Sequence, residues 1–422
     1  MLEAILKFSI QRSRLILVFV LALAALGAWN FTKLPIDAVP DITNVQVVIN
    51  TEAPGYTPLE VEQRVTFPLE TALAGVPGLV NTRSVSRYGL SQVVAIFTDE
   101  TDVYFARQLV GEKLSGAKAD LPQGLEPELG PISTGLGEIF MFTVDSVPGA
   151  TNEDGSLITP TDLRTVHDWI IRPQLMQVEG VVEVNPIGGF KREILIAIKP
   201  EKLLAHGLSQ QDIIRAVGEH NQNRGAGFIE RNGAQWLVRL PGQLADIEQL
   251  GNVPVATRTG LGLKLKDVAE VKEGKELRSG AATQNGREVV MSTVFMLIGE
   301  NSQIVAKDVG ERLAQINKSL PEGIVATAVY DRTKLVNKTL NTVKTNLTEG
   351  AILVIVILFL LLGNFRAALL TAAVIPFAML MTVTGMVQTG VSANLMSLGA
   401  LDFGLLVDGA IIIVENCMRR LS

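Results

Sequence analysis

The apolar residues of this 422-residue chain are concentrated in long, almost uncharged stretches near its two ends. One covers about residues 15–31, and three more cover about 347–363, 367–387 and 395–416. Each is close to the roughly 20 residues that an α-helix needs to cross a bilayer. Residues 32–346 have an ordinary mixed composition. The layout predicts four membrane-spanning helices and one large water-exposed region.

Composition excludes several other classes of protein. Only 19% of residues are charged, against roughly 25% in soluble domains. A net charge of -6 disfavours nucleic acid as a partner. The single cysteine, Cys417, excludes an intramolecular disulfide framework.

Basic residues predict the orientation of the spans. They precede the first span, occupy the turn between the second and third, and follow the fourth: Lys7, Arg12, Arg14, Arg366, Arg419 and Arg420. Positive charge favours the cytoplasmic side, so all three places are expected there. We therefore expect a multi-pass protein of the bacterial inner membrane with a large periplasmic region. A cleaved signal peptide is the alternative interpretation of the first stretch, because alanine-rich sequence follows its apolar residues.

The periplasmic region begins with a β-α-β-β-α-β pattern. β-Branched or alternating stretches predict strands at 45–51, 80–87, 91–98 and 138–144. Helices are predicted at 57–74 and 102–119. Thr57, Pro58 and Glu60 form the first turn of a capped helix, with Glu60 completing a capping box.

A second unit of the same kind begins at 138–144 and is interrupted. Its helix is predicted at 161–177 and its next strand at 181–185. New strands and helices then intervene, including a strand at 193–199 and a helix at 209–220. The pattern resumes with a strand at 288–297, a helix at 302–320 and a strand at 324–330. The fold class is thus an α+β membrane protein with ferredoxin-like split β-α-β units and an inserted subdomain.

These patterns divide the chain into six segments. The first transmembrane helix with a helix on the membrane surface covers 1–33, and the first α/β unit covers 34–135. The second unit covers 136–189 and 276–332, on either side of an insert at 190–275. The remaining three transmembrane helices cover 333–422.

The fourth apolar stretch carries the acids Asp402, Asp408 and Glu415. An uncompensated ionised Asp at the bilayer centre costs about 3 kcal/mol on insertion scales, so such groups face protein or water and usually serve a function. Burial and a nearby like charge both favour the protonated form of a carboxylic acid. The three acids therefore predict a proton relay at three depths along one helix. Gly404 and Gly409 are expected to let a neighbouring helix approach closely.

Two alternatives remain for these acids. The stretch could be a buried helix of a soluble domain, with its acids paired to basic groups. Glu415, at the predicted membrane edge, could simply be solvated.

The pattern Asp-Phe-Gly-x-x-Val-Asp-Gly-Ala-x-x-x-Val-Glu-Asn at 402–416 and the sequence Leu-Pro-Ile-Asp-Ala-Val-Pro-Asp at 34–41 carry a family resemblance. With them, the whole chain resembles the first half of a resistance-nodulation-division (RND) transporter of the heavy-metal efflux branch, cobalt-zinc-cadmium type. Asp402, Asp408 and Glu415 match the proton-relay positions of that family. Copper and silver pumps of this branch typically lack the first acid, so the resemblance implies divalent cations as cargo.

The resemblance also implies partners and a mechanism. Such pumps are homotrimers that join a periplasmic adaptor protein and an outer-membrane channel, and they export cations by proton antiport. The two α/β units are expected to be porter subdomains and the insert a docking subdomain. The transported metal ion is substrate, no cofactor is expected, and the protein is expected to be a secondary transporter and not an enzyme. Family members are about twice as long, so we expect this chain to be an N-terminal fragment, without the basic partner that a facing helix of the second half would supply.

Candidate cargo ligands are few in this chain. Glu138 and Asp168 match acidic positions that divalent-cation pumps use along the substrate path. Their alternatives are a strand-edge carboxylate and a solvated helix face. Met141, Met291 and Met296 could form a thioether site, but scattered methionines are usually packing residues.

Two competing functions remain open at this stage. The chain could belong to a pump for organic compounds, because paired acids in the fourth span also occur there. It could instead be a membrane anchor whose periplasmic region docks partners without transport. The sequence contains no phosphate-binding loop, nucleophile elbow or HExxH motif, which disfavours ATP hydrolysis and these common kinds of hydrolase.

Overall fold

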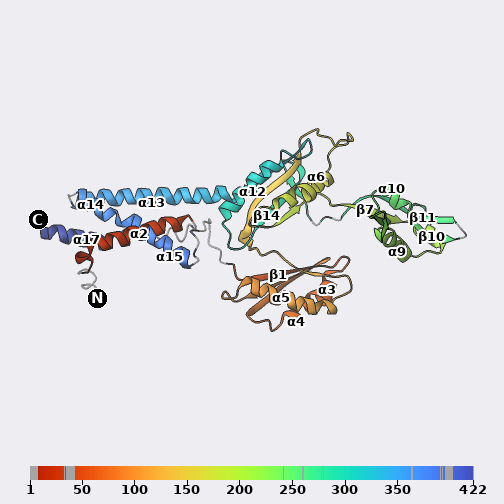
Figure 1. Cartoon of the computed structure of the whole chain (residues 1–422), viewed down its shortest axis with the longest axis horizontal. Helices are drawn as coiled ribbons and strands as arrows, with labels where there is room; N and C mark the ends of the chain where they lie inside the picture. The colour runs from red at the N-terminus through yellow and green to blue at the C-terminus, as the bar shows by residue number, and fades with distance from the viewer. Residues whose placement is uncertain are drawn as a thin grey trace.

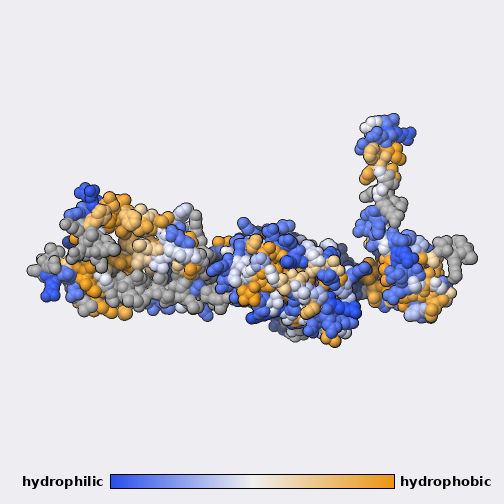
Figure 2. Space-filling view, turned by 90° about the horizontal axis from the view of Figure 1, so that it is seen from below, coloured by the Kyte–Doolittle hydropathy of each residue, from blue (hydrophilic) through white to orange (hydrophobic). Residues whose placement is uncertain are grey.

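The computed structural model describes residues 8–32, 34, 43–240, 242–258, 261–276, 278, 280–362, 365–389, 391, 393–394 and 403–421. The molecule is elongated, with a helical bundle at one end, two α/β units in the middle and the insert at the far end (Figure 1). Hydrophobic residues gather on the outside of the helical end, whereas the middle is largely hydrophilic (Figure 2). The arrangement is that of a bundle of apolar helices carrying a water-exposed α/β region.

Three helices in the described part of the chain are long and apolar enough to cross a membrane. They are α2 (Ser13–Phe31), the Arg332–Ile357 part of α13 (Arg332–Leu362), and α14 (Phe365–Ala372) together with α15 (Val374–Thr389). In length and composition these helices are candidates for the first three predicted spans, which they overlap. The fourth predicted span begins at residues that the structure does not describe, and its described part is α17 (Phe403–Leu421).

The break between α14 and α15 follows from Pro376. A proline ring clashes with the carbonyl four residues earlier and lacks the N–H that would bond to it. That carbonyl belongs to Ala372, where α14 ends. The helix is thus interrupted at Ala373, although α14 and α15 together still form one apolar segment of 25 residues, Phe365–Thr389.

The first α/β unit has a four-stranded antiparallel sheet of order β2-β3-β1-β4. Its strands are β1 (Gln46–Glu52), β2 (Leu79–Arg87), β3 (Leu90–Phe97) and β4 (Pro127–Leu129), and its main helices are α3 (Pro58–Val61), α4 (Phe67–Leu73) and α5 (Val103–Ala117). Alternate residues of β3 are fully or almost fully buried, which is the period of a sheet with one face in the core. The two helices and the first three strands predicted for this unit are confirmed to within a few residues. The strand predicted at 138–144 as its fourth is wrong for this unit, because that segment is β5 of the second sheet and the short β4 pairs with β1 instead.

The second unit repeats this strand order with β6-β14-β5-β15, while the short β13 (Ala282–Gln284) extends the edge beside β14. The strands are β5 (Glu138–Ser146), β6 (Val181–Ile187), β14 (Arg287–Met296) and β15 (Ile324–Asp331), covered by α6 (Pro160–Val166), α7 (Arg172–Leu175) and α12 (Ser302–Ile316). The predicted element order is confirmed: the chain leaves after β6 and returns at β13.

The first helix of each unit is widened at one place. A five-residue π-helical turn, η1 (Glu62–Thr66), separates α3 from α4, and a second, η4 (His167–Ile171), separates α6 from α7. The sequence predicted two uninterrupted α-helices here. Pro68 and Pro173 each stand two residues after the widened turn, which relieves the clash that a proline makes with the preceding turn.

The insert between β6 and β13 has its own small core. It contains β7 (Arg192–Ile198), α8 (Pro200–His206), α9 (Gln210–His220), β8 (Arg224–Arg231), β9 (Ala234–Leu240), α10 (Ile247–Gly251), β10 (Pro254–Arg258), β11 (Leu261–Lys264), α11 (Leu265–Val268) and β12 (Ala269–Lys275). β7 pairs with β12 along its whole length, so the strand that enters the insert lies beside the strand that leaves it. Leu203, Ile213, Leu250, Leu265 and Val268 form the centre of its core.

Candidate functional site

The acid-bearing helix α17 lies in the helical bundle and contacts α13, α14 and α15. Asp408 lies within α17, and Glu415 follows seven residues later. Seven residues are almost two turns of an α-helix, about 10 Å along the axis, so these acids lie on the same face at different depths. The side chain of Glu415 is exposed. Asp402 lies outside the described residues, as does the side chain of Asp408.

Gly409 of α17 does not behave as expected, whereas the surroundings of Gly404 lie outside the described part of the chain. A Cβ atom placed on Gly409 would meet no atom within 4 Å, so the predicted close approach of a helix at Gly409 is wrong for this structure. The close approach lies instead between α2 and α15. There, a Cβ on Gly27 would lie 2.7 Å from Leu380 Cβ.

The basic residues that predicted the orientation lie at one end of the bundle. The start of α2, the start of α14 and the end of α17 all lie at the end of the molecule that holds both chain termini (Figure 1). Arg12, Arg366 and Arg419 therefore mark the same side. This is the arrangement that the positive-inside rule requires of spans with alternating direction.

The two candidate cargo ligands belong to the second unit but to different elements. Glu138 opens β5, directly after the 3-10 turn Gly135–Gly137, and is half-buried. Asp168 is the second residue of the π-helical turn η4. In the part of the chain that the structure describes, no three His, Cys, Asp or Glu side chains come together as a group that could hold a metal ion.

The carboxylate of Asp168 is held on both sides. Arg164 Nε donates to Asp168 Oδ2 at 2.8 Å, and His167 Nδ1 lies 2.7 Å from Asp168 Oδ1. Burial alone would raise the pKa of Asp168, but the hydrogen bonds from His167 and Arg164 outweigh it and lower the pKa below its usual value. A cation at Asp168 would therefore have to compete with the Arg164 guanidinium.

His167 is completely buried and continues this chain of contacts into the sheet. Its Nε2 lies 2.9 Å from Ser292 Oγ on β14, and its ring stacks on Phe142 with 6.0 Å between centroids. Burial lowers the pKa of His167, although Asp168 partly opposes this. In the neutral ring, Nδ1–H donates to Asp168, and Nε2 accepts from the Ser292 hydroxyl.

Sequence reasoning missed this network except for Asp168. Arg164 could have been found, because a residue four positions earlier on a helix faces the same way. Ser292 interrupts an otherwise apolar stretch of β14, which is a weak signal for a buried polar partner. Nothing in the sequence pairs it with His167.

Comparisons with known proteins match almost the whole chain. The model of the AcrB/AcrD/AcrF family matches residues 5–422. The chain belongs to this family.

Proteins named for metal resistance or cation efflux match the chain over its full length. It is 58% identical over 422 residues to the cobalt-zinc-cadmium resistance protein CzcA of Cupriavidus metallidurans. It is 45% identical over 447 residues to the nickel and cobalt resistance protein CnrA of the same organism, and 35% identical over 426 residues to the cation efflux system protein CusA of Escherichia coli K12. All of this chain is covered in each case, but only 40% of CzcA, 41% of CnrA and 40% of CusA.

The fold is also that of a solved structure. An X-ray structure described as a heavy metal efflux pump matches 99% of this chain and 41% of the other with a TM-score of 0.87 and 32% sequence identity. The predicted resemblance to heavy-metal efflux transporters is thus confirmed by sequence and by fold. The chain spans about two fifths of the length of these relatives.

Proposed function

We propose that this chain forms part of an inner-membrane efflux pump that exports divalent metal cations in exchange for protons. The observation that carries the proton-driven part is Asp408, an acid inside an otherwise apolar helix that packs against three other helices of the bundle. A carboxylate in such a place is costly unless it is protonated or faces water. Reversible protonation of Asp402 and Asp408 would drive the cycle, and Glu415 would pass protons at the cytoplasmic end.

The cargo is proposed from the pattern of similarity. The chain is 58% identical to a protein named for cobalt, zinc and cadmium resistance, 45% identical to one named for nickel and cobalt resistance, and 35% identical to CusA. Zinc, cobalt, cadmium and nickel are therefore the cations to test. Asp402, the acid that copper and silver pumps typically lack, points the same way.

In this proposal the bundle contributes four spans, with α17 and the residues before it as the fourth. The α/β units are ferredoxin-like porter subdomains on the periplasmic side. β15 leads directly into α13, with Asp331 Oδ1 accepting from Thr333 N at 2.9 Å at the junction. A shift of α13 that follows protonation on α17 would therefore reach the second unit without an intervening loop.

Glu138 and Asp168 are proposed to lie along the cation path. Asp168 could serve only after Arg164 releases it, because both carboxylate oxygens are already hydrogen-bonded. Glu138 begins a strand and, like Asp168, is half-buried. Further ligands would come from the parts of the pump that this chain does not include.

The pump that contains this chain is proposed to form a homotrimer. Its other partners are proposed to be an adaptor protein and an outer-membrane channel. The insert lies farthest from the bundle (Figure 1), where a channel would dock. Its β8–β9 hairpin is a two-stranded arm, because neither strand pairs with another described strand. Phe228, Ile229, Trp236 and Leu237 are exposed on this arm, and a second copy would cover them.

Transport in inverted membrane vesicles containing the intact pump tests this function. Vesicles are energised to an acidic interior, and a fluorescent reporter follows the pH gradient. Addition of Zn²⁺, Co²⁺, Cd²⁺ or Ni²⁺ should dissipate part of the gradient while the cation accumulates inside. Dissipation by organic cations alone would assign the pump to the organic-compound branch. No response to either would favour a docking protein without transport.

A further inference from the structure

The insert is attached to the second unit by a narrow two-stranded connection. Among the described residues, no helix or strand of the insert packs extensively against one of the second unit. The connection runs through Gly188 and Gly189 on the way out and through Glu276, Arg278 and Gly280 on the way back. The angle between insert and unit must therefore be set at this hinge.

Glycine is required at both of these hinge positions, because a side chain at either would meet neighbouring atoms. Both have positive φ, 84° at Gly188 and 64° at Gly189. A Cβ on Gly189 would lie 2.7 Å from Pro160 O and 2.9 Å from Arg164 Cβ. The outgoing strand is thus pressed against the N-terminal part of α6.

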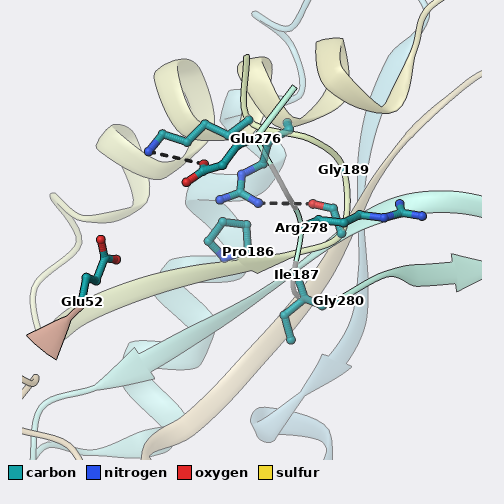
Figure 3. Close-up of a pocket in the computed structure, with 10 residues that line it drawn as sticks. Glu52, Pro186, Ile187, Gly189, Glu276, Arg278 and Gly280 are labelled. Carbon is teal, nitrogen blue, oxygen red and sulfur yellow. Dashed lines mark hydrogen bonds and ion pairs between the residues drawn. The ribbon is translucent and has the colours of Figure 1, made fainter. Parts of the chain in front are cut away.

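Arg164 ties this point of contact to the interior of the unit. Its Nη1 donates to Gly188 O at 3.2 Å, while its Nε donates to Asp168. Arg164, Gly188 and Gly189 line a pocket of about 350 Å³ together with Arg278 of the returning segment (Figure 3). The guanidinium is therefore shared between the hinge and the π-helical turn.

The far end of the chain of contacts is fixed in the sheet. Asp168 is held by His167, and His167 by Ser292, and both His167 and Ser292 are fully buried. Each link uses a directional hydrogen bond, so movement of one end displaces the other. The path runs from the centre of β14, through the widened turn, to the backbone of the hinge.

The returning segment is clamped on the opposite side. The Phe190 ring lies under Lys275 Nζ at 4.9 Å and Arg278 Cζ at 4.5 Å from its centroid. Arg278 also pairs with Glu288 on β14. The two segments of the hinge are thereby held together and to the same strand that carries Ser292.

We propose that the chain Ser292–His167–Asp168–Arg164–Gly188 is a latch that sets the angle of the insert on the second unit. The widened turn η4 places His167 and Asp168 so that one points into the core and the other toward the hinge. Rearrangement of this unit is passed to the insert through Arg164. The inference concerns the geometry of the hinge and does not depend on which cargo the pump carries.

Distances between spin labels test the latch in the intact pump. Labels are placed at Ala205 on α8 and Ala314 on α12, both exposed, in a Cys417→Ser background. Arg164→Met removes both hydrogen bonds, and the width of the distance distribution should at least double. Arg164→Lys can replace one bond only and should give an intermediate width.

Arg172→Met is the matched control, because Arg172 is an exposed arginine near the end of the same helical segment. It should leave the distribution unchanged. His167→Gln should broaden it as Arg164→Met does, although Gly188 O is untouched. Widths for Arg164→Met and Arg164→Lys equal to that of Arg172→Met would overturn the latch.

Discussion

Gly27 of α2 lies directly against Leu380 of α15, so that a single methyl group on Gly27 would collide with the backbone carbonyl and Cβ of Leu380. Small residues permit this kind of close packing between membrane helices, where dispersion contacts replace the hydrophobic effect. The contact fixes α2 against the helix that follows the Pro376 break. It is the closest approach that a glycine of these two helices makes.

Gly27→Ala should therefore lower the thermal stability of the solubilised protein by several degrees. Gly385→Ala is the control, because a Cβ on Gly385 of α15 would meet nothing within 4 Å. That variant should be neutral or slightly stabilising, since alanine favours a helix over glycine by about 1 kcal/mol. Equal melting temperatures for the two variants would show that α2 and α15 do not pack this closely.

Gly189→Ala should be more damaging than Gly286→Ala. Both glycines have positive φ, 64° and 78°, but only at Gly189 would a Cβ meet neighbouring atoms. The backbone strain of an alanine at positive φ, about 1–3 kcal/mol, is common to both variants. The difference between their free energies of unfolding therefore measures the steric contact at the hinge. Denaturant unfolding followed by hydrogen exchange of β14 measures it, and no difference would contradict the tight hinge.

Ser292→Ala should destabilise the second unit by about 1–3 kcal/mol, because it leaves buried His167 Nε2 without its partner. Ser319→Ala removes an exposed hydroxyl that bonds only to the carbonyl of Ile316 and serves as the control. Faster hydrogen exchange at β14 in the first variant alone is the expected result. If both variants exchange alike, the buried hydrogen bond contributes nothing measurable.

The cap of α6 predicts a pH dependence. Asp162 accepts hydrogen bonds from Thr159 N at 2.8 Å and Thr159 Oγ1 at 2.7 Å. Burial alone would raise the pKa of Asp162, but these bonds lower it below the usual value. A lowered folded-state pKa stabilises the protein above the unfolded value, near 3.9, and the stabilisation is lost as pH falls through the folded pKa.

Asp162→Asn should thus cost about 0.5 kcal/mol at pH 7, because the carboxylate is largely solvated. The cost should begin to shrink below about pH 4, where the acid becomes protonated in the unfolded state, and should vanish once the pH falls through the lowered folded-state pKa. Amide exchange at residues 160–166 measures the change. Glu153→Gln, which neutralises an exposed acid in the preceding loop, should show neither effect; a cost for Asp162→Asn that stays constant with pH would refute the account.

Much of the fold could be predicted because local signals agree with it. The capping box Thr57–Glu60 and the alternation along β3 place elements where the structure has them. The widened turns could not be predicted. Pro68 and Pro173 predict that the helix is interrupted. Whether it kinks, ends or forms a π-helical turn depends on the contacts that stabilise the turn before the proline. For η4 that is the bond from His167 to Ser292, which lies 125 residues away in the sequence.

The candidate site, like the fold, could be predicted from the sequence only in part. Acids in an apolar stretch can be recognised from the sequence alone. The free-energy cost of placing an ionised acid in a membrane is large whatever its neighbours are, so such an acid indicates a function. The state of Asp168 was not visible, since it depends on the Arg164 and His167 side chains. Predictions for Asp402, Glu415 and Glu138 remain predictions.

The proton-coupling role of Asp408 is tested most directly by Asp408→Asn in the reconstituted intact pump, with Zn²⁺ uptake and luminal pH recorded together. Glu311→Gln, which neutralises an exposed acid on α12, controls for loss of charge. The account predicts that Asp408→Asn assembles normally but loses both cation uptake and the accompanying proton flux, whereas Glu311→Gln keeps both. Zn²⁺ uptake and proton flux at the wild-type rate in Asp408→Asn would contradict it.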